Sequence, residues 1–147
     1  MSSVLLHDFI VEEHVKTALK EDIGIGDITT DYLVPKNERI IAKLNTRENG
    51  ILCGIDIVET VFKTLSNEVK IQKFFKDGDK IKKGDTLAVI EGPARAVLIG
   101  ERTALNYIQR LSGIATETNK YQVAIGDNKA RITDTRKTTP GFRMFEK

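Results

Sequence analysis

Two basic residues stand side by side near the end of the chain, Arg136 and Lys137, with threonines on both sides in the stretch ITDTRKTTPGF. An arginine presents a planar fork of N–H donors that fits a carboxylate or a phosphate, and a lysine adds a mobile point charge. Together with the neighbouring hydroxyl groups, the pair would suit a small ligand that carries several negative charges. The alternative is a solvated basic turn, because 23 Lys and Arg residues produce adjacent pairs by chance.

A second candidate is the charged pair Glu101 and Arg102, in a stretch whose apolar residues recur at helical spacing over residues 93–111. This spacing predicts a broad apolar face that contains Glu101, with Arg102 at its edge. A carboxylate on a buried face needs a partner, because an isolated buried charge is strongly unfavourable. From spacing alone, the favoured interpretation is a structural ion pair of these two residues, or an arginine that reaches solvent. A ligand-binding arginine is the alternative.

Two further groups of residues lack the spacing of a known type of site. His7 and His14 stand seven positions apart, and no Cys or acidic residues are arranged around them as ligands. We therefore expect no metal site in this chain. Gly24 and Gly26 lack the third glycine and the preceding strand of a dinucleotide-binding fingerprint.

Composition limits the class of protein. The 147 residues are 40% hydrophobic and 30% charged with a net charge of +2, as in an ordinary globular domain. The dispersed charges and sparse aromatic residues argue against nucleic-acid binding, and no apolar run is long enough to span a bilayer. The single cysteine, Cys53, excludes an internal disulfide, and the N-terminus lacks a secretion signal. We expect a cytoplasmic protein that binds neither nucleic acid nor membrane.

Patterns of apolar residues predict helices and strands along the chain. Helices are expected at residues 7–20, 55–65, 93–111 and 114–125. Strands are expected at residues 39–46, 51–53, 69–75, 86–91 and 130–134. Ser112 and Gly113 are expected to break the last two helices apart, and Asn49–Gly50 is typical of a tight turn between the first two strands.

The order of these elements predicts an α+β fold with the opening of an α/β unit at its end. The first ~110 residues mix strands and helices without strict alternation, whereas the last part reads helix, turn, strand. Arg136 and Lys137 would then lie just past the carboxyl end of a strand, where α/β folds build their sites.

Three stretches carry a resemblance to a known family: EDIGIGDITT (21–30), IEGPARAVLIGERTALNYIQRLSGIAT (90–116) and ARITDTRKTTPGFRMFEK (130–147). In order and spacing they are similar to the quinolinate phosphoribosyltransferases, also called nicotinate-nucleotide pyrophosphorylases, and the likeness covers essentially the whole chain. That resemblance implies a glycosyltransferase that joins quinolinate to phosphoribosyl pyrophosphate. The products would be nicotinate mononucleotide, pyrophosphate and CO2, in NAD biosynthesis.

The resemblance also implies an architecture and a site. An open-faced α/β sandwich would occupy residues 1–112, and residues 113–147 would begin a truncated α/β barrel with its first strand and helices. The protein would form a homodimer or a higher homo-oligomer. Arg102 would reach into the partner subunit's site, while Thr135, Arg136 and Lys137 would bind substrate. The catalytic residues are left unassigned, and Mg²⁺ would enter with phosphoribosyl pyrophosphate, on ligands outside this chain.

The chain departs from the family in length, because an α/β barrel needs about 200 residues or more. We therefore expect an N-terminal part that is inactive alone, with residues 114–147 mobile or held against another chain and cut by protease soon after Ser112–Gly113. Two alternatives stay open. One is a molybdenum-transport-associated paralogue of the same fold, and the other is a non-catalytic binding or assembly module. The role of Glu101 also stays open.

Overall fold

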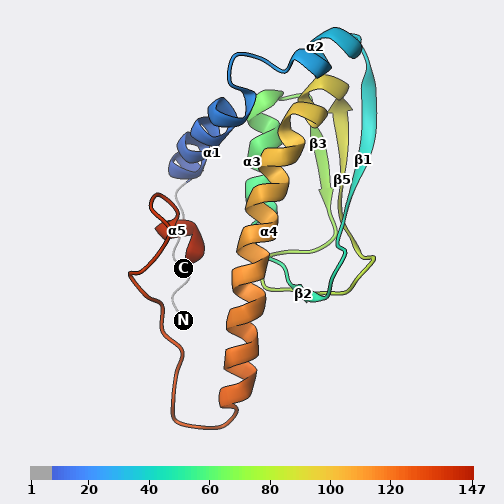
Figure 1. Ribbon diagram of the computed structural model, residues 1–147. Helices are drawn as coiled ribbons and strands as arrows, with labels where there is room; N and C mark the ends of the chain where they lie inside the picture. Colours follow the sequence, from blue (N-terminus) through green and yellow to red (C-terminus); the bar gives the residue numbers. More distant parts are fainter. Residues whose placement is uncertain (1–7) are drawn as a thin grey trace.

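The computed structural model describes residues 8–147, and Figure 1 shows a helical layer lying against a small sheet. The helices are α1 (Asp8–Ile23), α2 (Ile28–Leu33), α3 (Ile55–Leu65), α4 (Ala94–Ile125) and α5 (Arg143–Glu146). The strands are β1 (Arg39–Asn45), β2 (Gly50–Ile51), β3 (Lys70–Lys73), β4 (Lys80–Ile81) and β5 (Thr86–Pro93). Within residues 8–147, none of the helices combines the length and apolar character required to cross a bilayer.

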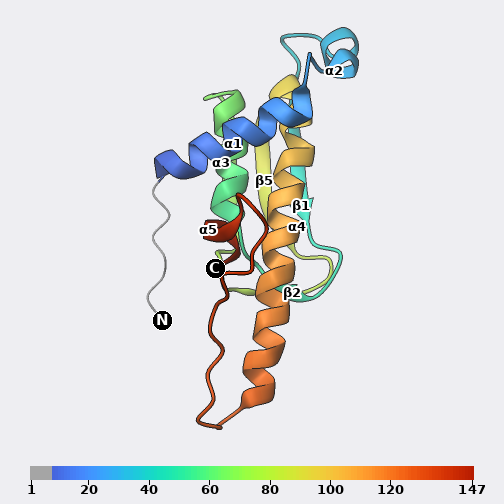
Figure 2. The same cartoon turned by 60° about the vertical axis from the view of Figure 1, so that its left-hand side comes forward.

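The main sheet is antiparallel, with β5 between β1 and β3. The side chains of β1 alternate, so that Ile40, Ala42 and Leu44 face the helices while Ile41 is 69% exposed on the opposite face. Helices α3 and α4 lie on one side of this sheet in both views (Figures 1 and 2). One covered and one open face confirm the predicted α+β open-faced sandwich.

The predicted hairpin across Asn49–Gly50 is wrong, because β1 pairs with β5 and β2 pairs with β4. The long pairing with β5 extends the buried face of the sheet, which a short local hairpin would not do. Thr116 Oγ1 in α4 accepts a hydrogen bond from the Ile51 amide at 2.8 Å, which fixes β2 against this helix. A Cβ on Gly50 would lie 2.6 Å from that same oxygen, so the site requires glycine.

Helix α3 has the predicted bounds, and its first turn is stabilised by a residue from another element. Gly54 precedes the helix with φ +98°, a conformation that glycine adopts without strain. It has no side chain to cap the helix. Asp77, in the loop between β3 and β4, accepts hydrogen bonds from the amides of Gly54 (2.9 Å) and Ile55 (3.0 Å) instead. The apolar face of α3 is thereby fixed over the sheet.

Helix α4 is continuous over 32 residues, so the predicted break at Ser112–Gly113 is wrong. The Ser112 hydroxyl donates to the Cys53 carbonyl at 3.1 Å and accepts from the Cys53 amide at 3.0 Å. Ser112 therefore holds α4 against the segment that follows β2. Glycine inside a helix costs only about 1 kcal/mol relative to alanine, which tertiary packing easily offsets. The helix passes through the predicted domain boundary at residues 112 and 113, and that boundary stays a prediction.

The predicted strand at residues 130–134 is also absent: the described chain is irregular from Gly126 to α5. A parallel strand needs neighbours to pair its backbone groups, and no other described strand lies beside this segment. The end of the segment does have partners within the chain. Phe142 packs at the edge of the core and Phe145 is buried in it, so the expectation that residues 114–147 are either mobile or held against another chain is wrong for this part of the segment.

Helices α3 and α4 approach closely at Gly100, where an added Cβ would lie 2.9 Å from two ring carbons of Phe62. We expect Gly100→Ala to lower the free energy of unfolding by about 1–3 kcal/mol through overpacking. Gly113→Ala, in the same helix with nothing within 4 Å of the new atom, is the matched control. It should raise stability by about 0.5–1 kcal/mol. Urea unfolding measures both, and equal effects would contradict this account of the helix contact.

Candidate functional site

Arg102 lies on the outer side of α4 with its side chain 72% exposed. Its Nε is 3.2 Å from Oδ1 of Asp22 at the end of α1, so its ion-pair partner is Asp22 and the predicted pairing with Glu101 is wrong. Glu101 is exposed, because the buried face of α4 is centred on small residues such as Gly100 and Ala104. A solvent-facing guanidinium with one acidic partner keeps most of its donors available for a ligand.

The EDIGIGDITT motif and the rest of α2 (residues 21–34) form a structured segment beside Arg102, called the platform below. Asp27 caps α2, accepting from the Thr30 amide at 3.0 Å and from the Thr30 hydroxyl at 2.7 Å. These two bonds, with a smaller contribution from the charge of Arg102, lower the pKa of Asp27. The segment next to Arg102 therefore keeps both a defined backbone and a fixed negative charge at neutral pH.

Arg95 fixes this platform to α4. Its side chain is 25% exposed, its Nε donates to the Val34 carbonyl at 2.9 Å, and its Nη2 donates to the Asp31 carbonyl at 2.8 Å. Arg95 thus serves the fold.

The loop that carries Thr135, Arg136 and Lys137 is tied through its backbone. The Lys137 amide donates to Thr135 Oγ1 at 3.1 Å, and Arg143 Nη2 donates to the Arg136 carbonyl at 3.3 Å. At its N-terminal side, Lys147 Nζ lies 2.5 Å from Oδ2 of Asp134 and lowers the pKa of that carboxyl. The backbone is held while the side chains of Arg136 and Lys137 remain exposed.

The charged ends of Arg136 and Lys137 have no hydrogen-bond or ion-pair partner anywhere in residues 8–147. Two adjacent cations without a carboxylate partner attract an anion, and the arginine supplies the geometry that a carboxylate or phosphate requires. The charged ends of this pair are therefore free to bind an anion, as the sequence predicted.

The four predicted binding residues lie in two separate segments of the chain. Across the described residues, no hydrogen bond or ion pair joins Arg102 to the loop at 135–137. The hydrogen bonds between α4 and that end of the chain are made by Arg110, about 12 Å along the helix axis from Arg102. Thr135, Arg136 and Lys137 form one group, and Arg102 lies on α4 beside Asp22.

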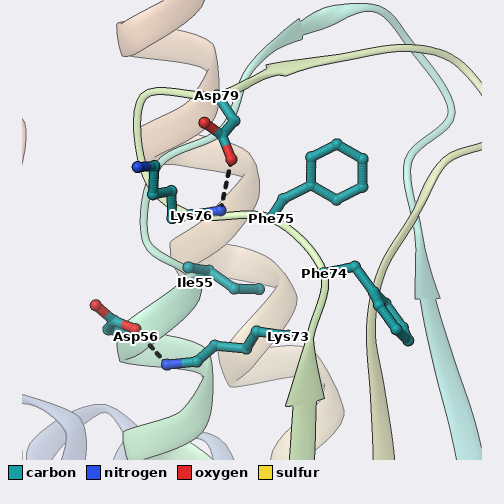
Figure 3. Close-up of a pocket in the computed structure, with 7 residues that line it drawn as sticks. All are labelled: Ile55, Asp56, Lys73, Phe74, Phe75, Lys76 and Asp79. Carbon is teal, nitrogen blue, oxygen red and sulfur yellow. Dashed lines mark hydrogen bonds and ion pairs between the residues drawn. The ribbon is translucent and has the colours of Figure 1, made fainter.

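A hollow of about 370 Å³ lies elsewhere, between the start of α3 and the β3–β4 loop (Figure 3). Two polar contacts lie within its lining: Lys73 Nζ is 2.5 Å from Asp56 Oδ1, and Asp79 accepts from the Lys76 amide at 2.9 Å. Phe74 and Phe75 supply much of the rest of its lining. None of Arg102, Thr135, Arg136 and Lys137 lines this hollow, so it is separate from the predicted binding residues.

The residues present do not fit a Mg²⁺ site. In the part of the chain that the structure describes, no three His, Cys, Asp or Glu side chains are grouped to hold a metal ion. His7 lies outside the described residues, and His14 contacts aromatic rings. Burial raises the pKa of Cys53 to about 11, so its thiol stays protonated and is a poor nucleophile or ligand at neutral pH.

Sequence reasoning missed an aromatic cluster that joins α1, α4 and the end of the chain, formed by His14, Tyr107, Phe142 and Phe145. His14 Nδ1 lies 2.5 Å from the Tyr107 hydroxyl, and its ring centroid is 4.9 Å from that of Phe142 and 4.5 Å from that of Phe145. Burial raises the pKa of Tyr107 to about 12. The only local signal was the helical spacing of Phe142 and Phe145, which gave no indication of their partners.

Comparison with known proteins places this geometry in context. Residues 27–112 match the model of the quinolinate phosphoribosyl transferase N-terminal domain, and residues 114–147 match that of the C-terminal domain. The "Probable nicotinate-nucleotide pyrophosphorylase (carboxylating)" of Bacillus subtilis is 44% identical over 86% of this chain and 44% of its own length. The mitochondrial quinolinate phosphoribosyltransferase 2b of Nicotiana tabacum is 38% identical over 93% of this chain and 39% of its own length.

Solved structures agree. NadC from Streptococcus pyogenes has a TM-score of 0.93 and 39% identity, covering 97% of this chain and 51% of that one. The nicotinate-nucleotide pyrophosphorylase from Francisella tularensis has a TM-score of 0.91 and 37% identity, covering 99% of this chain and 52% of that one. The chain thus spans about half the length of the relatives and structures it matches.

The aromatic cluster predicts a stability that depends on pH. Burial lowers the pKa of His14 from its usual 6.5, although a hydrogen bond with the Gly141 backbone partly opposes this. The folded state therefore favours the neutral ring. The stability linked to this group is complete above about pH 6.5 and is lost as the pH falls through the lower folded-state pKa.

We expect the melting temperature to fall between about pH 7.5 and pH 5.5 in a His7→Gln background, where His14 is the remaining histidine. Adding His14→Gln should flatten the profile in this window, since carboxylates titrate at lower pH. Thermal unfolding followed by circular dichroism measures both proteins. An identical pH dependence in the two would show that His14 is not the responsible group.

Proposed function

The chain belongs to the quinolinate phosphoribosyltransferase family, and from this premise we propose that the complete protein makes nicotinate mononucleotide from quinolinate and phosphoribosyl pyrophosphate. Pyrophosphate and CO2 would be the other products, and the reaction would serve NAD biosynthesis. This activity belongs to the complete protein, since the chain spans about half of its relatives. The observation that carries the proposal is the pair of unpartnered cations, Arg136 and Lys137. Their backbone is held by hydrogen bonds with the side chains of Thr135 and Arg143.

Quinolinate is a pyridine with two adjacent carboxylates, so its recognition requires fixed positive groups. The Arg136 fork can donate two parallel hydrogen bonds to one carboxylate, and Lys137 can neutralise the second. The Thr135 hydroxyl accepts a hydrogen bond from the Lys137 amide, which fixes the backbone that carries the two side chains. A dianion bound here would have its ring oriented by both carboxylates at once.

That orientation is what the reaction demands. The pyridine nitrogen attacks the anomeric carbon of the ribose, a C–N bond forms, and the C–O bond to pyrophosphate breaks. The carboxylate next to the nitrogen then leaves as CO2, and the ring carbon that carried it takes up a proton. Arg136 and Lys137 would aim the nitrogen at the sugar and balance the negative charge as CO2 departs. Mg²⁺ would accompany phosphoribosyl pyrophosphate, on ligands outside this chain.

Arg102 fits a site shared between subunits. Its side chain is exposed and pairs with Asp22, whereas the loop at residues 135–137 (the cation loop) is bonded to Arg143. The adjacent platform exposes large apolar side chains, among them Ile25, Ile28, Tyr32 and Leu33. Exposed apolar groups around a charged residue are typical of a protein interface. We propose a homodimer, or a larger assembly of dimers, in which Arg102 reaches the partner subunit's substrate, and we place this protein in the cytoplasm.

Substitutions in the complete protein test the roles of the cations. Arg136→Lys keeps the charge but loses the fork, and Arg102→Ala removes a charge-assisted hydrogen bond worth about 1.5–3 kcal/mol. Each should lower kcat/KM for quinolinate by about 10- to 100-fold. Arg131→Ala, at an exposed position without a partner among the described residues, should leave it unchanged. Absence of nicotinate mononucleotide formation by the unmodified protein would refute the proposed activity.

A mixing experiment tests the shared site. Arg102→Ala and Arg136→Ala proteins should each be nearly inactive, whereas subunits co-expressed in equal amounts should recover about a quarter of the unmodified activity. Half of the dimers are then mixed, and one of their two sites combines an intact Arg102 with an intact Arg136. Recovery no higher than that of the separate variants would place both residues in a site within one subunit.

A further inference from the structure

Arg110 joins α4 to the end of the chain through several directed bonds. Its Nε donates to Glu146 Oε1 at 3.0 Å, and its Nη2 bonds both Glu146 Oε1 and Thr139 Oγ1. The other Glu146 oxygen accepts from the Thr139 amide at 3.1 Å. Arg110, Glu146 and Thr139 thus form a closed set of contacts in which each residue bonds the other two.

Burial reinforces these contacts. The Glu146 side chain is only 10% exposed, and its bonds with Arg110 lower the pKa of its carboxyl, so it stays ionised at neutral pH. The Arg110 guanidinium carbon lies 5.2 Å from the ring centroid of Phe142, within range of a cation–π contact. Phe142 belongs to the aromatic cluster with His14, so α1 also supports this junction.

The junction is connected to the cation loop by Arg143. Its Nε donates to Thr138 Oγ1 at 3.2 Å and its Nη2 to the carbonyl of Arg136 at 3.3 Å. Thr138 directly precedes Thr139, which Arg110 holds. A continuous path of bonds therefore runs from α4 to the backbone of Arg136 and leaves the charged end of that side chain free.

We propose that Arg110 is a positioning residue for the substrate site, acting through Thr139 and Glu146 to hold the loop at residues 135–137 in its binding geometry. This inference rests on the proposed function, because the loop must be the place where quinolinate binds. The same rigid helix carries Arg102, about 12 Å away along its axis. One element would then fix the cation loop of its own subunit while presenting an arginine to the partner's site.

Kinetics of the complete protein provide the first test. Arg110→Gln should raise the KM for quinolinate by about 10-fold or more, the loss expected for hydrogen bonds to a charged group. The KM for phosphoribosyl pyrophosphate and the melting temperature should change much less. Arg110→Lys should restore little, because one ammonium cannot reproduce the fork that meets Thr139 and Glu146 together. Lys120→Gln removes an ion pair of the same helix that is remote from the loop, and is the control.

Hydrogen exchange of the 147-residue chain provides a second readout that needs no activity. In Arg110→Gln, peptides covering residues 132–142 should exchange faster, while peptides from β5 should keep their protection. Thr139→Val, which deletes one acceptor of Arg110 with little change in shape, should give part of the same effect if Arg110→Gln fails to fold.

The two tests separate failure of this inference from failure of the proposed function. An unmodified protein without quinolinate activity, but with faster exchange at 132–142 in Arg110→Gln, would refute the activity and support Arg110 as the residue that holds the loop. An active protein in which Arg110→Gln changes neither the quinolinate KM nor exchange at 132–142 would overturn the inference. A KM change that merely follows a general loss of stability would overturn it as well.

Discussion

The close packing of α4 on α3 and β2 is the contact on which the rest of the structure depends. Gly100 lets Phe62 and Leu65 approach the helix backbone, and Leu111 closes over Gly54 further along. Because these contacts lie on one face of a single rigid helix, they fix both its position and its rotation. The rotation of the helix then decides in which direction each charged side chain on its other faces points.

The rotation of α4 explains why neighbouring residues have different surroundings. Thr103 and Tyr107 turn inward, whereas Arg102 points to solvent and pairs with Asp22. Arg110, two turns after Arg102, faces the end of the chain and pairs with Glu146. One helix therefore carries two arginines with separate tasks, one available to a ligand and the other engaged with its own chain.

The cation loop illustrates how unpaired charge is kept without a large cost in stability. Arg136 and Lys137 remain in water, where the penalty for lacking a partner is small. The polar contacts that the loop needs are made by its backbone and its threonines, with Arg143, Arg110 and the Lys137 amide among the donors. A site for a dianion can then be rigid in its main chain and still open at its charged tips.

The sequence by itself determined the elements whose signals are local. The spacing of Ile57, Val58, Val61 and Phe62 predicted α3 with its observed bounds, because an amphipathic helix is encoded by residues three and four apart. The adjacent cations at 136 and 137 and the motifs around them were likewise readable from the chain, and they identified the family. Neighbours in sequence suffice for such features.

Only the tertiary structure decided which distant residues meet. It paired β1 with β5, carried α4 through Ser112–Gly113, left residues 130–134 without a strand, and gave Arg102 the partner Asp22. It also brought Arg110 to Glu146, which is 36 positions away. Local spacing carries no information on these pairings. They are set by which buried surfaces fit together and by which backbone groups find partners once the helices are docked.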